Sequence, residues 1–257
     1  MVKTGGDKLT AMVLVVVSNG LMGLVVAMFY PLPGAAIWPW IAASGLIRTA
    51  YYLALGYAYE HGDLSRVYPI ARGAAPLFVL GAGALLLPDQ LSGVQVSGIL
   101  ALGLGILLMA HGVFTNGESR RLVPFAITSA MATAAYSITD GTGARLSGEA
   151  VAFVAWALAV TALLYLPIAV VLRGRVVLRA DGREWGRGIF AGAASYLAYT
   201  IVVWAMTQAP IALVAALRET SILFAVLIGW LLFGERMGWG KALAALLIVA
   251  GAALTRL

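Results

Sequence analysis

Nearly all the apolar residues of this chain fall into segments of about 20 residues, the length of helix that crosses the roughly 30 Å hydrocarbon core of a bilayer. Gly, Pro and charged residues separate these segments. Hydrophobic residues make up 62% of the 257 positions and charged residues only 11%, a balance that a water-facing globular surface does not tolerate. The chain is therefore predicted to be an all-α, polytopic membrane protein with a single transmembrane domain over residues 1–257.

The apolar segments predict nine transmembrane helices. They are expected at about 8–30, 35–60, 64–88, 93–114, 122–145, 149–172, 186–208, 210–234 and 238–256. Most links between them are short and rich in turn-forming residues, so successive helices are expected to run antiparallel. The longer polar stretch from Arg173 to Arg187 contains five arginines and is expected to be a solvated loop with an interfacial turn.

The basic residues lie mostly in loops on one side of the predicted membrane. Twelve of the 17 Lys and Arg residues fall on that side and two on the other, so the positive-inside rule makes the first side cytoplasmic. We expect a multi-pass protein of the cell (inner) membrane. The net charge of +6 does not indicate nucleic-acid binding, because no separate basic domain is present to contact phosphates.

Two residue types that often carry chemistry are scarce. The chain has no cysteine, which excludes disulfides, thiol nucleophiles and Cys-ligated metals. Its two histidines, His61 and His111, do not have metal-ligand spacing. We therefore predict no metal and no cofactor.

An internal repeat appears when the chain is shifted on itself by 146 residues. The pair of predicted helices at 64–114 then aligns with the pair at 210–256. The shift superimposes Arg72 on Arg218, Leu100 on Leu246, and Gly105 on Gly251. An odd number of helices separates the copies, so the second is expected to be inverted relative to the first. We predict a first repeat at 1–117 and a second at 118–257; the first has four helices against five, and its first helix is expected to be missing.

Five ionisable residues stand inside the predicted spans, where each costs about 2.5–3.5 kcal/mol on insertion scales. They are Arg48, Arg72, Asp140, Arg218 and Glu219. Such residues usually face a cavity or pair with one another. We therefore consider them candidates for a transport site.

Arg72 and Arg218 occupy equivalent helices, about eight residues from the end, which places each ~12 Å deep. Both are predicted to line a midplane cavity and to attract a carboxylate or another anionic group of the cargo. The alternative is that each pairs with an acid and fixes helix packing. Pro69 and Pro76 flank Arg72 and are predicted to kink its helix.

Asp140 and Glu219 are the candidates for proton coupling, since a carboxylate shielded from water can change its charge during a transport cycle. The alternative is structural ion pairing. Glu219 directly follows Arg218, and Asp140 lies five residues before Arg145.

Aromatic residues accompany the charged ones on two predicted helices. Arg48 shares a helical stripe with Tyr51 and Tyr52, which favours binding of aromatic or anionic cargo; packing at the membrane interface is the alternative. The helix at 186–208 offers Tyr196, Tyr199 and Trp204, suited either to a cavity wall or to hydrogen bonds between helices.

Three segments resemble the ten-helix EamA-type members of the drug/metabolite transporter superfamily. They are residues 62–73, the segment 136–143 that begins with Tyr136, and residues 218–224 leading into 231–236. The resemblance implies two inverted five-helix repeats around a central cavity, with Tyr136 among the substrate-binding residues. It also implies a secondary transporter that exports or exchanges amino acids, related metabolites or lipophilic compounds by alternating access. The expected partners are a small-molecule substrate and membrane lipids.

Two other functions remain open from the residues alone. An integral membrane enzyme would need clustered Asp, His or Cys motifs, which the sequence does not offer, so we do not expect an enzyme. A membrane scaffold without transport activity is the second alternative, because the first repeat is expected to be incomplete.

Overall fold

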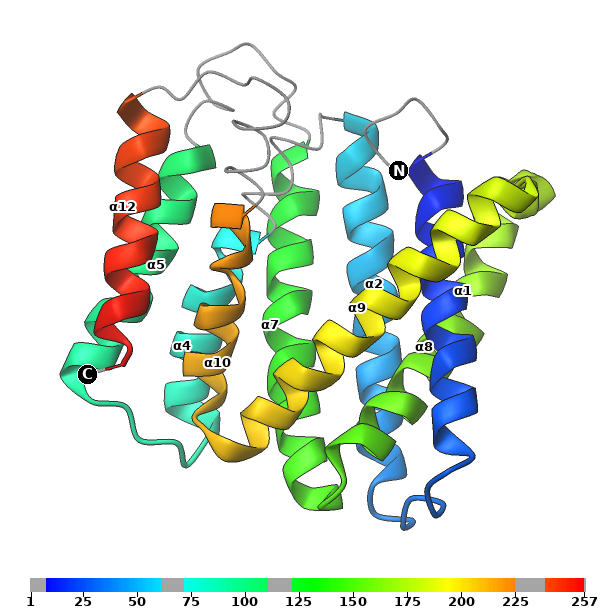
Figure 1. The fold of residues 1–257 in the computed structure, drawn as a ribbon, viewed down its shortest axis with the longest axis horizontal. Coiled ribbons are helices and arrows are strands. Elements are labelled where there is room, and N and C mark those ends of the chain that lie inside the picture. The colour runs from blue at the N-terminus through cyan, green and yellow to red at the C-terminus, as the bar shows by residue number, and fades with distance from the viewer. Residues whose placement is uncertain (1–7, 62–71, 111–121, 225–238, 257) are drawn as a thin grey trace. The chain divides into compact units, whose positions relative to one another are not determined.

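A computed structural model of the chain describes residues 8–61, 72–110, 122–224 and 239–256, and every regular element in these ranges is a helix (Figure 1). The helices are α1 (Lys8–Ala27), α2 (Trp38–His61), α4 (Ala75–Leu86), α5 (Gly93–Ala110), α7 (Leu122–Ser147), α8 (Ala150–Arg173), η1 (Arg175–Leu178), α9 (Gly182–Gln208), α10 (Ile211–Arg218) and α12 (Trp239–Leu254). The all-α class is confirmed. The loop arginines Arg66, Arg120, Arg121 and Arg236, together with Pro69 and residues 225–234 of the predicted helix 210–234, lie outside the described residues.

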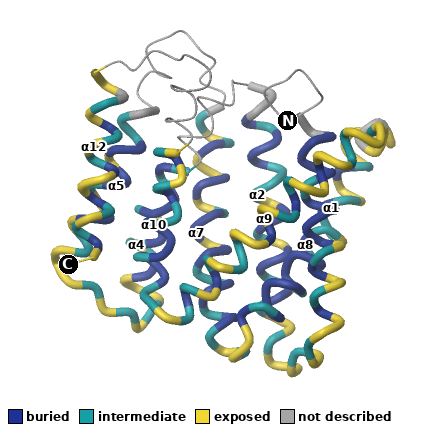
Figure 2. Tube along the Cα trace, in the orientation of Figure 1, coloured by how far each residue is buried: buried dark blue, intermediate teal, exposed yellow. Residues whose placement is uncertain are grey.

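The outward surface of the helices is apolar. In the described ranges, three helices are long and apolar enough to cross a membrane: Thr10–Ala27, Ala150–Arg173 and Gly182–Gln208. Large apolar side chains are exposed along the helices, among them Leu85, Leu163 and Phe190. Figure 2 shows exposed positions along the helices. Because exposed apolar side chains of this number suit lipid rather than water, the fold is that of a multi-pass membrane protein.

Helix α9 begins earlier than its apolar pattern predicts. It starts at Gly182 rather than near 186, and the short helix η1 occupies part of the predicted loop. The Asp181 carboxylate accepts the N–H of Glu184, while the Glu184 carboxylate accepts the N–H of Asp181 at 3.1 Å. This reciprocal capping box begins the helix in a charged stretch, and the prediction of a loop up to Arg187 was wrong for that reason.

The chain divides into two compact units, each built from residues of both halves of the sequence. The first comprises 1–56 and 135–208, and the second comprises 57–134 and 209–257. Helices α2 and α7 contribute residues to both.

In the first unit, α1 packs against α8, and α9 crosses both (Figure 1). Small residues allow this approach: a Cβ at Gly23 would lie 2.4 Å from the carbonyl oxygen of Ala155, and one at Gly20 would lie 2.3 Å from the Cβ of Ala162. Phe153 and Tyr165 are the largest fully buried side chains in the described part of this unit. Its core is therefore held by close helix contact around a few aromatic rings.

In the second unit, α5 packs against α12, and α10 packs against α4 (Figure 1). The α5–α12 contact is between backbones: a Cβ at Gly251 would lie 2.6 Å from the carbonyl oxygen of Gly98, and one at Gly105 would lie 2.9 Å from that of Ala244. These two contacts exchange under the 146-residue shift, because Gly98 corresponds to Ala244 and Gly105 to Gly251. The helices thus meet through equivalent residues.

Replacing Gly251 with alanine should destabilise the protein by about 1–3 kcal/mol, because the new methyl group meets backbone that has no rotamer to change. Gly81→Ala on α4 is the matched control, since a Cβ there meets nothing within 4 Å. That substitution should be neutral or stabilise by about 0.5–1 kcal/mol, as expected for alanine in place of glycine within a helix. Thermal unfolding of the two variants in detergent checks the difference, and equal effects would contradict the close contact.

Candidate functional site

Arg48 and Asp140 form an ion pair in the first unit. Arg48 lies on α2 and Asp140 on α7, and their side chains are 5% and 0% exposed. Nη2 of Arg48 donates to Oδ2 of Asp140, and the Tyr199 hydroxyl of α9 donates to the same oxygen at 2.6 Å. Three helices that are far apart in sequence therefore meet at one carboxylate.

Tyrosine rings surround this ion pair. The guanidinium carbon of Arg48 lies 4.4 Å from the ring centre of Tyr136 and 4.3 Å from that of Tyr199. Both distances fall within the range of a cation–π interaction. Tyr51 packs edge-on against Tyr136 and also against Tyr52, which contacts Tyr165. The result is a cationic group with two aromatic walls.

The ion pair keeps unused hydrogen-bonding capacity. Oδ1 of Asp140 and Nε of Arg48 are buried and have no hydrogen-bond partner. Buried polar atoms normally find a partner in protein, water or ligand. One free acceptor and one free donor on a neutral pair suit a group that carries both a donor and an acceptor.

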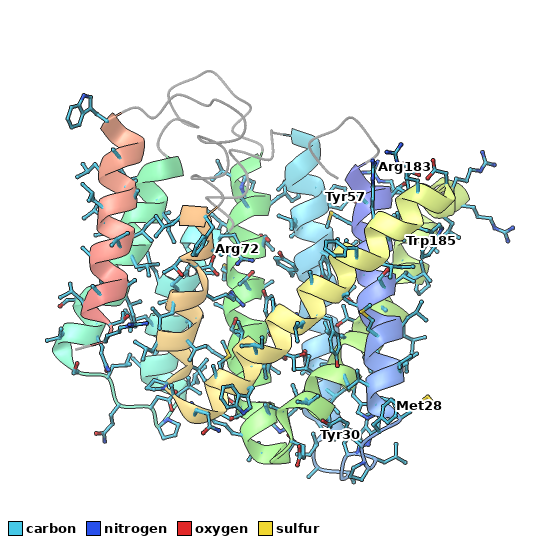
Figure 3. All side chains as sticks on the ribbon, in the orientation of Figure 1. Met28, Tyr30, Tyr57, Arg72, Arg183 and Trp185 are labelled. Carbon is cyan, nitrogen blue, oxygen red and sulfur yellow. The ribbon has the colours of Figure 1, made fainter. Side chains whose placement is uncertain are left out.

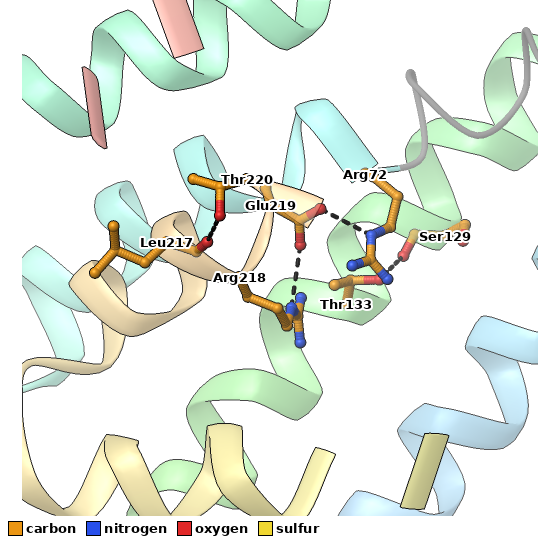
Figure 4. A network of polar contacts seen from close by, with 7 residues as sticks. All are labelled: Arg72, Ser129, Thr133, Leu217, Arg218, Glu219 and Thr220. Carbon is orange, nitrogen blue, oxygen red and sulfur yellow. Dashed lines mark hydrogen bonds and ion pairs between the residues drawn. The ribbon is translucent and has the colours of Figure 1, made fainter. Parts of the chain in front are cut away.

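A second charged group lies in the second unit and consists of Arg72, Arg218 and Glu219 (Figure 4). Nε of Arg72 donates to Oε2 of Glu219 at 2.8 Å, and Nε of Arg218 donates to Oε1 at 3.1 Å. The Glu219 side chain is fully buried, while those of Arg72 and Arg218 are 17% and 11% exposed. Each carboxylate oxygen thus binds one arginine, and the three side chains together carry one net positive charge.

The helices that carry this group are interrupted at corresponding places. Ala74, one residue before α4, caps that helix, and Pro76 in its first turn has no N–H to continue an earlier ladder. After α10, the N–H of Glu219 bonds to Ala216 and that of Thr220 to Leu217, three residues back instead of four. Near the predicted kink, the helix that contains Pro76 begins only after Ala74, two residues beyond Arg72. Pro69 lies outside the described residues.

Arg72 points into the interior of its unit. Figure 3 shows it among the helices, in contrast to Arg183 and Trp185 near the start of α9. In Figure 4 its guanidinium points toward Thr133 and Ser129 of α7. Ionisable residues that face the interior of an apolar helix bundle mark candidate functional sites.

Residues 121–257 match the family model of the EamA-like transporters. The chain belongs to the EamA-like transporter family. The match covers more than half of the chain, so the expected relationship is confirmed. The family places this EamA-like protein among membrane transporters of small molecules rather than among enzymes.

A solved crystal structure supports the fold of this EamA-like chain over nearly its full length. The alignment covers 99% of this chain and 90% of the other, with a TM-score of 0.79 and 20% sequence identity. At that identity the similarity concerns the fold alone. A search of curated proteins found no match.

The predicted site residues of the EamA-like chain separate into two groups. Tyr51, Tyr52, Tyr136 and Tyr199 lie around Arg48 and Asp140, and Arg72, Arg218 and Glu219 lie together. The structure places two others apart: Tyr196 is 8% exposed in the aromatic core of α8 and α9, and Trp204 is 54% exposed on α9. Trp204 therefore occupies a position suited to lipid contact.

The sequence reading missed a polar stripe on α7. Ser129, Thr133, Ser137 and Asp140 follow one another by steps of four, four and three, and all are fully buried. Small hydroxyl side chains at this spacing in an apolar helix are a readable signal of an inward face. Within residues 8–61, 72–110, 122–224 and 239–256 no group of three or more metal-ligating side chains was found.

Proposed function

We propose that this EamA-like protein is a secondary transporter of small metabolites such as amino acids or related compounds, which it exports or exchanges across the cell membrane. The observation that carries the proposal is the presence of buried and largely buried ionisable side chains within both helical units. Placing a charged side chain in a membrane interior costs several kcal/mol of free energy, and residues found there usually have a function. A polar interior within an apolar exterior is the arrangement that moves polar cargo through lipid.

In this proposal the two charged groups have different preferences. The Arg48–Asp140 pair is neutral, has a free donor and a free acceptor, and has aromatic walls, so it suits a zwitterionic or aromatic part of the cargo. The Arg72–Glu219–Arg218 group carries net positive charge and suits an anionic part. Asp140 and Glu219 are the proposed proton-coupling residues.

The proposal includes an inverted repeat and alternating access between its halves. The contacts of α5 with α12 support a two-fold relationship: Gly251 approaches Leu102 and Gly105 approaches Ile248, and these pairs also exchange under the 146-residue shift. Reciprocal contacts of this kind arise at an interface between two copies related by a two-fold axis.

Counterflow in proteoliposomes tests the function. The purified chain should accelerate uptake of a radiolabelled amino acid when the vesicles are preloaded with the same unlabelled compound, because an alternating-access carrier returns faster when loaded. A panel of neutral, acidic and aromatic amino acids covers the proposed cargo. Uptake that no preloaded compound stimulates would contradict an exchanger, and vesicles without protein give the background.

A further inference from the structure

We infer that the Glu219 carboxylate occupies the place of a cargo carboxylate when the site is empty. When Glu219 takes up a proton, it releases the two arginines, and these then bind the carboxylate of the cargo. This inference rests on the proposed transport function and specifies its substrate class and coupling. It assigns the Arg72–Glu219–Arg218 group to binding of a monocarboxylate together with one proton.

The geometry already describes how the site would hold a carboxylate. Glu219 presents one oxygen to Nε of Arg72 and the other to Nε of Arg218, at 2.8 and 3.1 Å. Charge-assisted hydrogen bonds of this kind are roughly twice as strong as those between neutral groups. A free carboxylate in the same position would meet the same two donors.

Glu219 and a cargo carboxylate compete for these two donors. If the ionised Glu219 turned away, it would remain as a buried charge without its partners, which is strongly unfavourable. A protonated Glu219 is neutral and can leave the arginines without that cost. Entry of the anion is therefore accompanied by uptake of one proton from solution, and the net charge of the group stays the same.

Within the described residues, the two helices that pack against α10 offer no other group to supply this proton linkage. Helix α10 packs against α4 and α5, and neither of these helices contains a titratable residue. The stretch 122–134 of α7 contains none either. Of the remaining ionisable residues in the described part of this unit, Glu60 and His61 end α2, Asp89 accepts the N–H of Ile211 at the opposite end of α10, and Lys241 and Arg256 belong to the α12 region. In the described part of the chain, the ion-pair contacts of the Glu219 carboxylate are with Arg72 and Arg218.

The backbone is irregular at Glu219. The N–H groups of Glu219 and Thr220 bond three residues back, and those of Ile222 and Leu223 bond to Glu219 and Thr220 in the same way. Bonds with this shorter spacing mark a local departure from the regular helix, often found at hinges. The carboxylate therefore sits at a point where a small backbone change can redirect it.

The test uses benzoate as the carboxylate probe and benzamide as its neutral counterpart of the same shape. Binding to the purified full-length protein in detergent is measured by calorimetry between pH 5.5 and 8, with empty micelles as the blank. For the wild type, the dissociation constant of benzoate should rise by up to tenfold for each pH unit, as expected when one proton binds with the ligand. Benzamide should bind weakly at every pH.

The decisive variant is Glu219→Gln, which keeps the size of the side chain and removes its charge. It should bind benzoate at least tenfold more tightly than the wild type at pH 7.5, with little dependence on pH. Weaker binding by Glu219→Gln, or wild-type binding that does not change with pH, would overturn the inference. If the variant does not fold, as judged by gel filtration and circular dichroism, the wild-type pH series decides alone.

Counterflow on the same preparations separates this inference from the proposed function. If the wild type exchanges an amino acid but binds benzoate without pH dependence, the transport function is supported and the proposed role of Glu219 is contradicted. If Glu219→Gln binds benzoate more tightly but the wild type shows no counterflow, the proposed role of Glu219 is supported and the proposed transport function is contradicted.

Discussion

Replacing Asp140 with asparagine should lower the free energy of unfolding by about 3–5 kcal/mol, the largest effect we expect of any single substitution. The change keeps the shape of the side chain but leaves the buried Arg48 guanidinium without its counter-charge. Loss of one partner of a buried pair costs more than loss of both, because the remaining charge cannot reach water. Thermal or denaturant unfolding in detergent measures the difference.

Two further variants define the cause of that loss. Tyr199→Phe keeps the ring beside Arg48 and removes one hydrogen bond to Asp140, so it should cost only about 1–3 kcal/mol. The double variant Arg48→Met with Asp140→Leu removes both charges and should be more stable than Asp140→Asn. If the double variant were the less stable of the two, the explanation by an uncompensated charge would be wrong.

Arg72→Ala and Arg218→Ala should each reduce transport by about tenfold or more, since a hydrogen bond to a charged group is worth about 1.5–3 kcal/mol. Each substitution removes one of the two donors that the proposed carboxylate site offers. Initial rates of counterflow in proteoliposomes, normalised to the amount of folded protein, provide the measurement.

Arg179→Ala is the control for these two variants because Arg179 is exposed and lies between η1 and α9. It should leave the rate within about twofold of the wild type, as expected for a surface substitution. If all three substitutions reduced transport alike, the assignment of Arg72 and Arg218 to a cargo site would fail. Loss of overall positive charge would then be the better explanation.

The positions of the helices could be predicted because a bilayer requires apolar segments of a fixed length. Ranges such as 149–172 and 122–145 agree with α8 and α7 to within a few residues at both ends, while residues 111–114 of the predicted helix 93–114 lie outside the described part of the chain. The start of α9 was missed because Asp181 and Glu184 begin it by capping, in a stretch where no apolar period exists. Apolar pattern and capping are independent signals, and only the first was used there.

The sequence predicted which residues belong to the candidate site, but it predicted only some of their interaction partners. Ionisable side chains in apolar spans identified Arg48, Asp140 and Glu219. Asp140 was considered with Arg145, its neighbour in sequence, yet it binds Arg48, which is 92 residues away, while Arg145 donates to the carbonyl of Met206. Long-range pairing depends on which helices pack together, and a single sequence does not contain that information.

The backbone contact between α5 and α12 has a mechanical consequence for any transport cycle. Gly98 meets Gly251 and Gly105 meets Ala244 through backbone atoms. No long side chain lies between the helices at these points that could change rotamer when one helix moves against the other. We therefore expect the two helices to move together as a rigid body. Conformational change in this unit therefore has to be taken up elsewhere, and the irregular turn after α10 is the described segment best suited to bend.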